Sequence, residues 1–265
     1  MMSRLSAALE GERKSLLAYI VAGDPDREAT LELMHDLVES GVDAIELGVP
    51  FSDPEAEGPV IQLAHERALQ SSTSLEHCLG IVRDFRETDR RTPVILMGYL
   101  NPVESMGYEK FANRAAKSGV DGLIIVNLPP EEASVLKESL RKNSLDLIYL
   151  VAPTTTQQRM EMICSESSGF VYYVSLKGTT GAGTLDVKEV ESKLVQLRSA
   201  SNLPILVGFG IKNGETAAAV GAYADGVVVG SALVDLIAKQ EPGQGNKDVC
   251  NLLREIRQGL DEVSG

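Results

Sequence analysis

Short apolar runs rich in valine, isoleucine and leucine recur from one end of this 265-residue chain to the other. Most of them are apolar continuously rather than alternately, which is typical of parallel strands buried on both faces. Eight such runs occur, at residues 16–23, 43–50, 93–100, 121–127, 146–153, 170–175, 204–210 and 225–230. Segments with helical periodicity lie between them, at 28–41, 109–119 and 215–222 among others. Eight alternating units without a sign of a second domain predict one (β/α)₈ barrel over residues 1–265.

The spacing of these runs predicts where the barrel departs from regularity. A near-repeat, seen in SGVDAIEL, SGVDGLII and GAYADGVVV, places a glycine at the end of a helix and an aspartate before the next strand. The second and third runs, however, are about 50 residues apart, which predicts a long loop and an extra helix after strand two. That loop leaves the carboxyl end of the strand, where barrel enzymes keep their active sites. The amphipathic segment 1–15 predicts an additional amino-terminal helix.

Composition excludes several classes of protein. The net charge of −13 and the pI near 4.8 argue against a nucleic-acid partner, because such a protein carries a basic face. Residues 1–15 contain no signal-peptide core, and no apolar stretch is long enough for a membrane helix. We therefore expect a cytoplasmic protein with no membrane partner.

The cysteines and histidines predict no metal or disulfide. The three cysteines lie far apart without CxxC spacing: Cys78, Cys164 and Cys250. The three histidines fall in stretches that read as helical, and we expect them to be surface or packing residues: His35, His65 and His77.

Glycines at the ends of the last strands predict an anion site. Gly210 ends the seventh run, and Gly230 ends the eighth. Ser231 follows Gly230, and a short apolar helix begins there. Glycine lets backbone amides approach an anion closely, and barrels often bind phosphate between the last two strands and a short helix. A third glycine-rich turn, 177–183, could close this cradle. The spacing does not match the GxGxxG fingerprint of dinucleotide-binding folds.

Glu46 is a candidate acid–base residue. Its neighbours Ile45 and Leu47 should face the helices, which directs Glu46 into the barrel. Among Tyr19, Met97 and other apolar side chains the carboxyl would be desolvated, which raises its pKa and suits it to donate a proton near neutral pH. We find no lysine or arginine at the matching ends of neighbouring strands that would pair with it.

Six motifs now indicate a family: AYIVAGDPD, ELGVPFSDP, LMGYLNPV, TTGA, GFGI and VVVGSALV. In this order, and over residues 18–234, they resemble the signatures of the tryptophan synthase alpha chain family. ELGxPFSDP is highly specific to that family, whereas the glycine turns are shared with many phosphate-binding barrels.

The resemblance implies a lyase of tryptophan biosynthesis that splits indole-3-glycerol phosphate into indole and glyceraldehyde 3-phosphate by a retro-aldol reaction. It implies that Glu46 is the acid–base residue at indole C3 and that Tyr172 lies beside it. It implies a phosphate site at Thr180, Gly181, Gly210, Gly230 and Ser231. It also implies an indole pocket, whose apolar walls the ring needs in any case, lined by Tyr19, Met97, Ile124 and Phe209.

The resemblance further implies a partner. The loop with Ser52, Asp53 and Pro54 resembles the surface by which alpha chains dock on a beta chain that carries pyridoxal phosphate. We expect an α₂β₂ heterotetramer, with no cofactor in this chain. A direct transfer of indole to such a partner makes physical sense because indole is apolar.

The sequence also departs from the family pattern. The family usually has an aspartate where this chain has Glu57, and an apolar residue where it has Glu55. Asn127 stands where aspartate is common, and GYLNP replaces TYYNP. Glu57 keeps the charge but reaches farther by about 1.5 Å, a difference that matters for near-attack geometry. We predict that Glu57, on a loop, is the second catalytic carboxylate.

Two alternatives remain open from the sequence. One is another phosphate-binding barrel, such as a sugar-phosphate isomerase or indole-glycerol phosphate synthase, although the latter would need a lysine in an early strand. The other is an activating subunit that binds glycerol phosphates, switches its partner on and turns over little.

Overall fold

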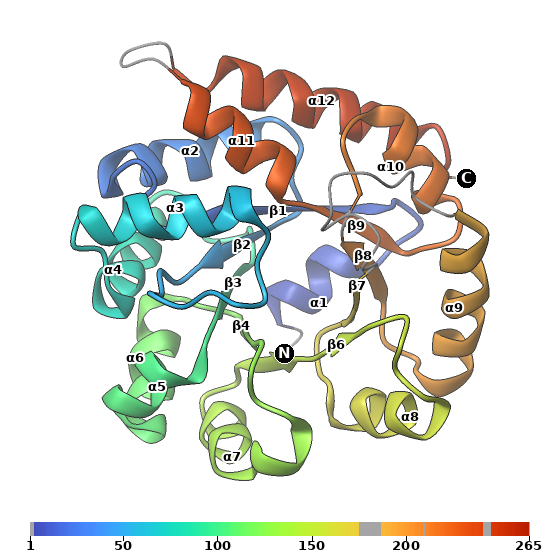
Figure 1. The fold of residues 1–265 in the computed structure, drawn as a ribbon, viewed down its shortest axis with the longest axis horizontal. Helices are drawn as coiled ribbons and strands as arrows, with labels where there is room; N and C mark the ends of the chain where they lie inside the picture. The colour runs from blue at the N-terminus through green and yellow to red at the C-terminus, as the bar shows by residue number, and fades with distance from the viewer. Residues whose placement is uncertain (1–2, 175–186, 209, 241–244, 265) are drawn as a thin grey trace.

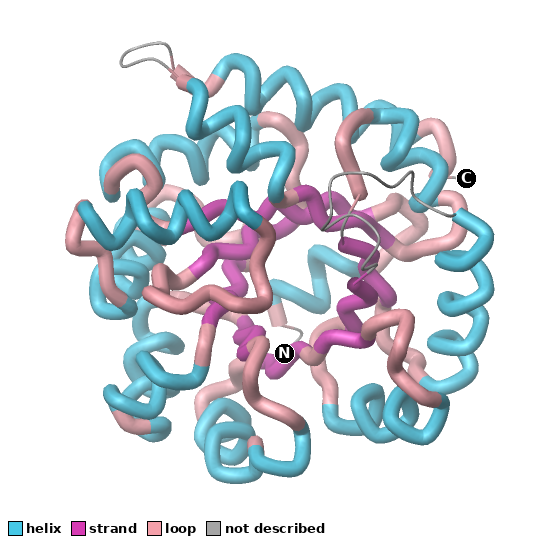
Figure 2. Tube along the Cα trace, in the orientation of Figure 1, coloured by secondary structure: helices cyan, strands magenta, loops and turns pink. Residues whose placement is uncertain are grey.

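The computed structural model describes residues 3–174, 187–208, 210–240 and 245–264. Parallel strands form a ring in the centre, and helices surround it (Figures 1 and 2). The sheet order is β5-β4-β3-β2-β1-β9-β8-β7-β6. The strands are β1 (Ser15–Val21), β2 (Ala44–Gly48), β3 (Val94–Gly98), β4 (Gly122–Ile125), β5 (Asp146–Ile148), β6 (Leu150–Val151), β7 (Val171–Val174), β8 (Ile205–Gly208) and β9 (Gly226–Val229).

The predicted fifth strand is divided into β5 and β6, which is the one difference in strand order. β5 pairs with β4, and β6 pairs with β7, so the two ends of the sheet are consecutive in the chain. Tyr149 lies between them, and its carbonyl accepts a hydrogen bond from the Tyr172 amide at 3.2 Å. The ring therefore closes through one interrupted strand, and the predicted (β/α)₈ barrel is confirmed.

Helices cover the outside of this ring and confirm the predicted segments to within about two residues, the usual uncertainty of a helix end. Two helices separate β2 from β3, as the sequence spacing predicts, and a short helix precedes β1. The helices are α1 (Arg4–Leu9), α2 (Arg27–Glu39), α3 (Pro59–Gln70), α4 (Leu75–Phe85), α5 (Leu100–Met106), α6 (Tyr108–Ser118), the 3₁₀ turn η1 (Pro130–Glu132), α7 (Ser134–Lys142), α8 (Gln157–Glu166), α9 (Val187–Ala200), α10 (Gly214–Gly221), α11 (Ser231–Lys239) and α12 (Lys247–Asp261). Within the described ranges, no helix has the length and apolarity needed to cross a membrane.

Side chains alternate between the two faces of each strand. On β2, Ile45 and Leu47 pack into the layer between strands and helices. A second apolar cluster fills the ring, and Leu5 and Leu9 of α1 belong to it together with Phe170. Helix α1 lies across the centre of the ring in Figure 1 and closes its amino end. The interior is therefore packed at one end and left for the site at the other.

The aspartates of the near-repeat hold neighbouring strands together. Asp43 accepts a hydrogen bond from the Leu16 amide, and Asp121 accepts one from the Val94 amide, both at 2.8 Å. An arginine pairs with each carboxylate: Arg257 with Asp43 at 3.1 Å and Arg86 with Asp121 at 2.9 Å. The repeated aspartate thus accepts from an amide at the start of an adjacent strand and compensates the charge of a nearby arginine.

The third member of the repeat behaves in the same way at a more exposed position. Asp225 accepts from the Ile205 amide at 2.8 Å and pairs with Arg198 at 2.9 Å. Its side chain is 32% exposed, against 6% for Asp121. If the aspartate is replaced, water can therefore hydrate the groups that it had bound at position 225, but not those at position 121.

We expect Asp121→Ala to lower the free energy of unfolding by about 3 kcal/mol, because it leaves the Val94 amide without a partner and removes the ion pairs of Asp121 with Arg86 and Arg4. The matched Asp225→Ala variant should lose about 1 kcal/mol. Urea denaturation followed by circular dichroism measures both. Equal losses at the two positions would contradict this account.

Candidate active site

Glu46 lies inside the barrel, as the sequence predicts. It is in register with Tyr19 of β1 and Ile95 of β3, which both belong to the interior cluster. The residue is 1% exposed. Among the residues that the structure describes, neither carboxylate oxygen of Glu46 has a hydrogen-bond partner. This placement is costly for a charge, and it keeps the group available to a ligand.

Burial determines the protonation of the two candidate carboxyls. Desolvation, followed by the negative charge of Glu57, raises the pKa of Glu46 to about 8. Desolvation raises the pKa of Glu57 to about 7, although this side chain on the 49–58 loop is only half-buried. At neutral pH Glu46 holds its proton, and Glu57 is divided between its two forms. Such a pair can both donate and accept protons near pH 7.

Two tyrosines share the barrel interior with Glu46: Tyr19 is in register with it, and Tyr172 lies on β7. The pKa of Tyr172 is raised by burial and by the charges of Glu46 and Glu57. The pKa of Tyr19 is raised by burial and by the same two charges, with Glu57 before Glu46. Glycines make room for both hydroxyls, because a Cβ at Gly48 would lie 2.5 Å from Tyr19 Oη and one at Gly208 would lie 2.4 Å from Tyr172 Oη.

The residues expected to line the indole pocket share the barrel interior. Ile124 is fully buried in the interior cluster, and Met97 is half-buried against it. They are in register on β3 and β4. Tyr19 and Tyr172 belong to the same cluster, and Tyr19 and Ile95 flank Glu46 on the two neighbouring strands. The other expected contacts lie outside the described residues: Phe209, Thr180 and Gly181.

The described part of the phosphate cradle comes together at the ends of β8 and β9, which pair in parallel. Gly210 follows β8 with φ +83°, a conformation that favours glycine. Gly230 follows β9, and its carbonyl accepts from the Leu233 and Val234 amides, so it caps α11. Ser231 is the first residue of that helix, where backbone amides have no partner within the helix.

The structure adds Tyr99, which the sequence analysis did not single out. Its ring stacks on Phe51 with centroids 4.8 Å apart, and its hydroxyl accepts a hydrogen bond from the Ala56 amide at 3.0 Å. Its place at the carboxyl end of β3 could have identified it. The side chain of Asn127, a departure from the family pattern, accepts from the Leu100 amide and so fixes the start of α5.

His65 is the second residue that the sequence left without a role beyond surface or packing. It is 2% exposed and belongs to the inward face of α3, with Ile61, Ala64 and Ala68. This helical spacing was the available signal. Its ring makes one hydrogen bond to Tyr19 and one to the backbone of Phe51 in the 49–58 loop.

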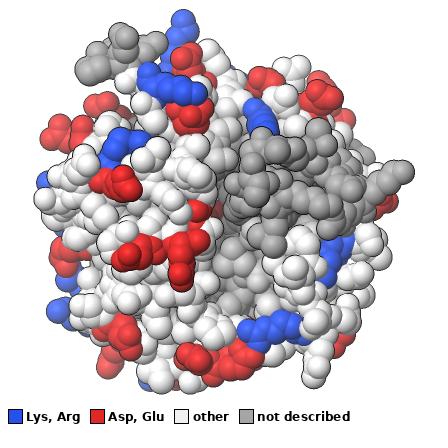
Figure 3. Space-filling model, viewed as in Figure 1, with Lys and Arg blue, Asp and Glu red and all other residues white. Residues whose placement is uncertain are grey.

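The charges around the mouth of the barrel are mixed. Figure 3 shows the face of Figure 1, with acidic side chains around the rim and Lys and Arg side chains set apart from one another. In this view the described basic side chains form no continuous surface, in keeping with the acidic composition.

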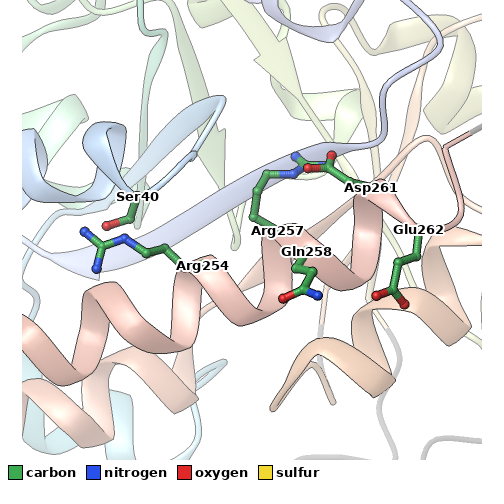
Figure 4. Close-up of a pocket in the computed structure, with 6 residues that line it drawn as sticks. All are labelled: Ser40, Arg254, Arg257, Gln258, Asp261 and Glu262. Carbon is green, nitrogen blue, oxygen red and sulfur yellow. The ribbon is translucent and has the colours of Figure 1, made fainter.

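A separate depression lies on the outside of the barrel along α12 (Figure 4). Arg257 in it pairs with Asp43 at 3.1 Å and with Asp261 at 2.8 Å. The pair with Asp43 joins α12 to the barrel, whereas the pair with Asp261 lies within the helix, so we assign the depression a structural role. It is lined by Ser40, Arg254, Arg257, Gln258, Asp261 and Glu262.

Known proteins resemble this chain in sequence over nearly its whole length. A sequence model of the family described as "Tryptophan synthase alpha chain" matches residues 5–262. A protein of that name from Marinobacter nauticus is 53% identical, over 99% of this chain and 100% of the relative. One from Thioalkalivibrio sulfidiphilus is 54% identical, over 98% and 100%.

Solved structures agree. The tryptophan synthase subunit alpha from Legionella pneumophila superposes with a TM-score of 0.90 at 47% identity, covering 99% of this chain and 100% of that one. A chain of the tryptophan synthase complex from Pyrococcus furiosus superposes with a TM-score of 0.84 at 35% identity, covering 92% and 98%.

The raised pKa of Glu46 predicts that the protein loses stability as pH rises toward 8. The folded protein holds a proton up to about pH 8 that the unfolded chain releases near its ordinary value of 4.5. The stability contributed by this proton is complete below the ordinary pKa and is lost as pH rises through the folded one. Glutamine has no such proton, so its substitution for Glu46 removes this loss. The free energy of unfolding of Glu46→Gln minus that of the parent should therefore increase by on the order of 3 kcal/mol from pH 5 to pH 9.

Urea denaturation at a series of pH values tests this expectation. The control is Glu66→Gln, on the exposed face of α3, whose stability difference from the parent should change little over the same range. A difference for Glu46→Gln that stays constant with pH would mean that this carboxyl is not buried as described.

Proposed function

Because this chain belongs to the tryptophan synthase alpha chain family, we propose that it cleaves indole-3-glycerol phosphate into indole and glyceraldehyde 3-phosphate as the lyase subunit of tryptophan biosynthesis. One observation carries the proposal: two carboxyls have pKa values of about 8 and 7, Glu46 on a strand within the apolar interior and Glu57 half-buried on the loop that follows this strand. A retro-aldol cleavage needs groups that move protons near neutral pH, and indole needs apolar walls.

The proposed reaction assigns one task to each carboxyl. Protonated Glu46 donates to indole C3 while Glu57 takes the proton from the indole nitrogen. Glu46 then accepts the proton of the glycerol hydroxyl, a carbonyl forms, and the bond between indole C3 and the glycerol carbon breaks. Its electron pair restores the aromatic ring, and Glu57 returns its proton to nitrogen. Both carboxyls end in their starting states, so no oxidant, metal or cofactor in this chain is needed.

The remaining site residues bind and orient the substrate in this proposal. Tyr172, which belongs to the interior cluster, contacts the substrate beside Glu46 in this proposal. The ring packs against Tyr19, Met97 and Ile124, with Phe209 as a further expected contact. The phosphate binds the glycine turns and the first amides of α11, through Gly210, Gly230 and Ser231, and through Thr180 and Gly181 by resemblance.

The proposed partner is a beta chain with pyridoxal phosphate, in an α₂β₂ assembly in the cytoplasm. The expected docking loop is accessible, because Ser52 and Asp53 are exposed and Pro54 is half-buried. The Pyrococcus furiosus structure is described as a tryptophan synthase complex. Transfer of indole within such a complex keeps an apolar product out of water.

The two carboxyls give the first test of this function. We expect Glu46→Gln to remove nearly all indole release and to leave the affinity for glycerol phosphate nearly unchanged, since it keeps shape and loses only the proton. Glu57→Gln should lower turnover by roughly 10²-fold or more, whereas Glu57→Asp should be tolerated. Indole release with saturating beta chain is the measurement.

Glu55→Gln, on the exposed neighbour in the same loop, is the matched control and should retain turnover. If Glu57→Gln equals the parent instead, Glu57 is not the second catalytic carboxylate. If all four variants and the parent release little indole but activate the beta chain equally, the chain is an activating subunit.

The docking loop gives the second test. Adding the beta chain should raise indole release, and Asp53→Lys should weaken the complex by roughly tenfold or more, because it reverses a charge at the expected interface. Asp248→Lys makes the same change on α12, outside the ring, and should not. Calorimetric titration gives the affinities. Equal indole production with and without the beta chain would count against the partner.

A further inference from the structure

The ring of His65 has a defined protonation pattern. Nδ1 lies 3.1 Å from the Phe51 backbone nitrogen, which can only donate, so Nδ1 is the unprotonated acceptor. Nε2 lies 3.3 Å from Tyr19 Oη. Burial lowers the pKa of His65 to about 4, so the ring is neutral and its proton is on Nε2. The Nε2–H group therefore donates to the Tyr19 oxygen.

This bond determines what the Tyr19 hydroxyl can do. Its oxygen accepts from His65, which leaves its own hydrogen to donate in another direction. Gly48 provides the space, because a Cβ there would overlap the hydroxyl. Tyr19 is in register with Glu46 on the neighbouring strand, and its side chain belongs to the interior cluster.

The second bond of His65 restrains the loop that carries Glu57. His65 holds the loop at Phe51, near its beginning. One helical turn earlier on α3, Gln62 Nε2 donates to the Glu57 carbonyl at 2.9 Å. Helix α3 thus binds the loop on both sides of the segment between Phe51 and Glu57. His65 also joins this clamp to β1 through Tyr19.

We propose that His65 is a positioning residue for the reaction: it directs the Tyr19 hydroxyl toward the carboxyl pair and fixes the loop that carries Glu57. This inference rests on the proposed function, because the geometry that His65 maintains is that of Glu46 and Glu57. His65 does not itself touch the reacting atoms and acts through its two hydrogen bonds.

Three substitutions separate the two bonds. His65→Asn keeps an acceptor close to the Nδ1 position and loses the contact with Tyr19. His65→Gln keeps a donor close to the Nε2 position and loses the contact with Phe51. His65→Leu loses both bonds and keeps an apolar side chain of similar size on the buried face of α3.

Steady-state indole release with saturating beta chain is the first measurement. We expect His65→Leu to lower kcat by roughly 10- to 100-fold with a change in KM of less than about threefold, because it disturbs the reacting geometry and not the phosphate site. His65→Asn and His65→Gln should each restore part of the loss. In a Tyr19→Phe background, His65→Asn should cause no further loss, since the bond it removes is already absent.

Nitrogen NMR of protein labelled in histidine gives a second readout that does not depend on turnover. Neutral His65 should keep its proton on Nε2 between pH 5.5 and pH 8, and Tyr19→Phe should shift the Nε2 signal but not the tautomer. A ring that titrates in this range, or carries its proton on Nδ1, would overturn the inferred bonds.

The outcomes distinguish the two proposals. If the parent releases indole and His65→Leu, still folded by circular dichroism, keeps full kcat, the positioning role is wrong and the proposed function stands. If His65→Asn and Tyr19→Phe lower kcat additively, the two side chains act independently and the link between them is wrong. If the parent releases no indole, both proposals are wrong, whatever the nitrogen spectra show about the bonds.

Discussion

The carboxyl of Glu46 sits on a strand inside a closed ring of apolar side chains, without a hydrogen-bond partner among the described residues. In such a place the charged form is costly, so the group holds its proton to about pH 8. A closed parallel barrel can tolerate this cost because its stability comes from the layer between strands and helices, to which Ile45 and Leu47 contribute. Because successive side chains of a strand point to opposite faces, the residues that stabilise the barrel lie on one face and the residue proposed for proton transfer lies on the other.

The rest of the interior is arranged around this group. Gly48 and Gly208 leave space for the hydroxyls of Tyr19 and Tyr172, so that polar atoms are accommodated where most barrel positions carry apolar side chains. Helix α1 closes the amino end of the ring, which leaves the carboxyl end as the side from which a ligand can enter. Each of these features has a local cause, and together they place proton-transferring groups between apolar walls.

The sequence predicted what depends on short-range periodicity. Alternation in the ELG segment placed Glu46 inside, and the uneven spacing of the apolar runs predicted the helix α3. It did not predict the break at Tyr149. The single apolar run 146–153 forms both β5, which pairs with β4, and β6, which pairs with β7, and this division depends on how the barrel closes. It also missed the bonds of His65, since these join residues 46 and 14 positions away. Such contacts exist only once the fold brings the elements together.

The two carboxyls differ in how they are held, and this difference bears on the expected replacement of an aspartate by Glu57. Glu46 is fixed by a strand paired on both sides, so a change in side-chain length there would move the carboxyl relative to everything around it. Glu57 is half-buried on a loop restrained through backbone contacts to Tyr99 and Gln62. These contacts do not specify the length of its side chain. A longer carboxylate can therefore be accommodated by a small shift of the loop, which keeps the charge near Glu46 without rebuilding the barrel.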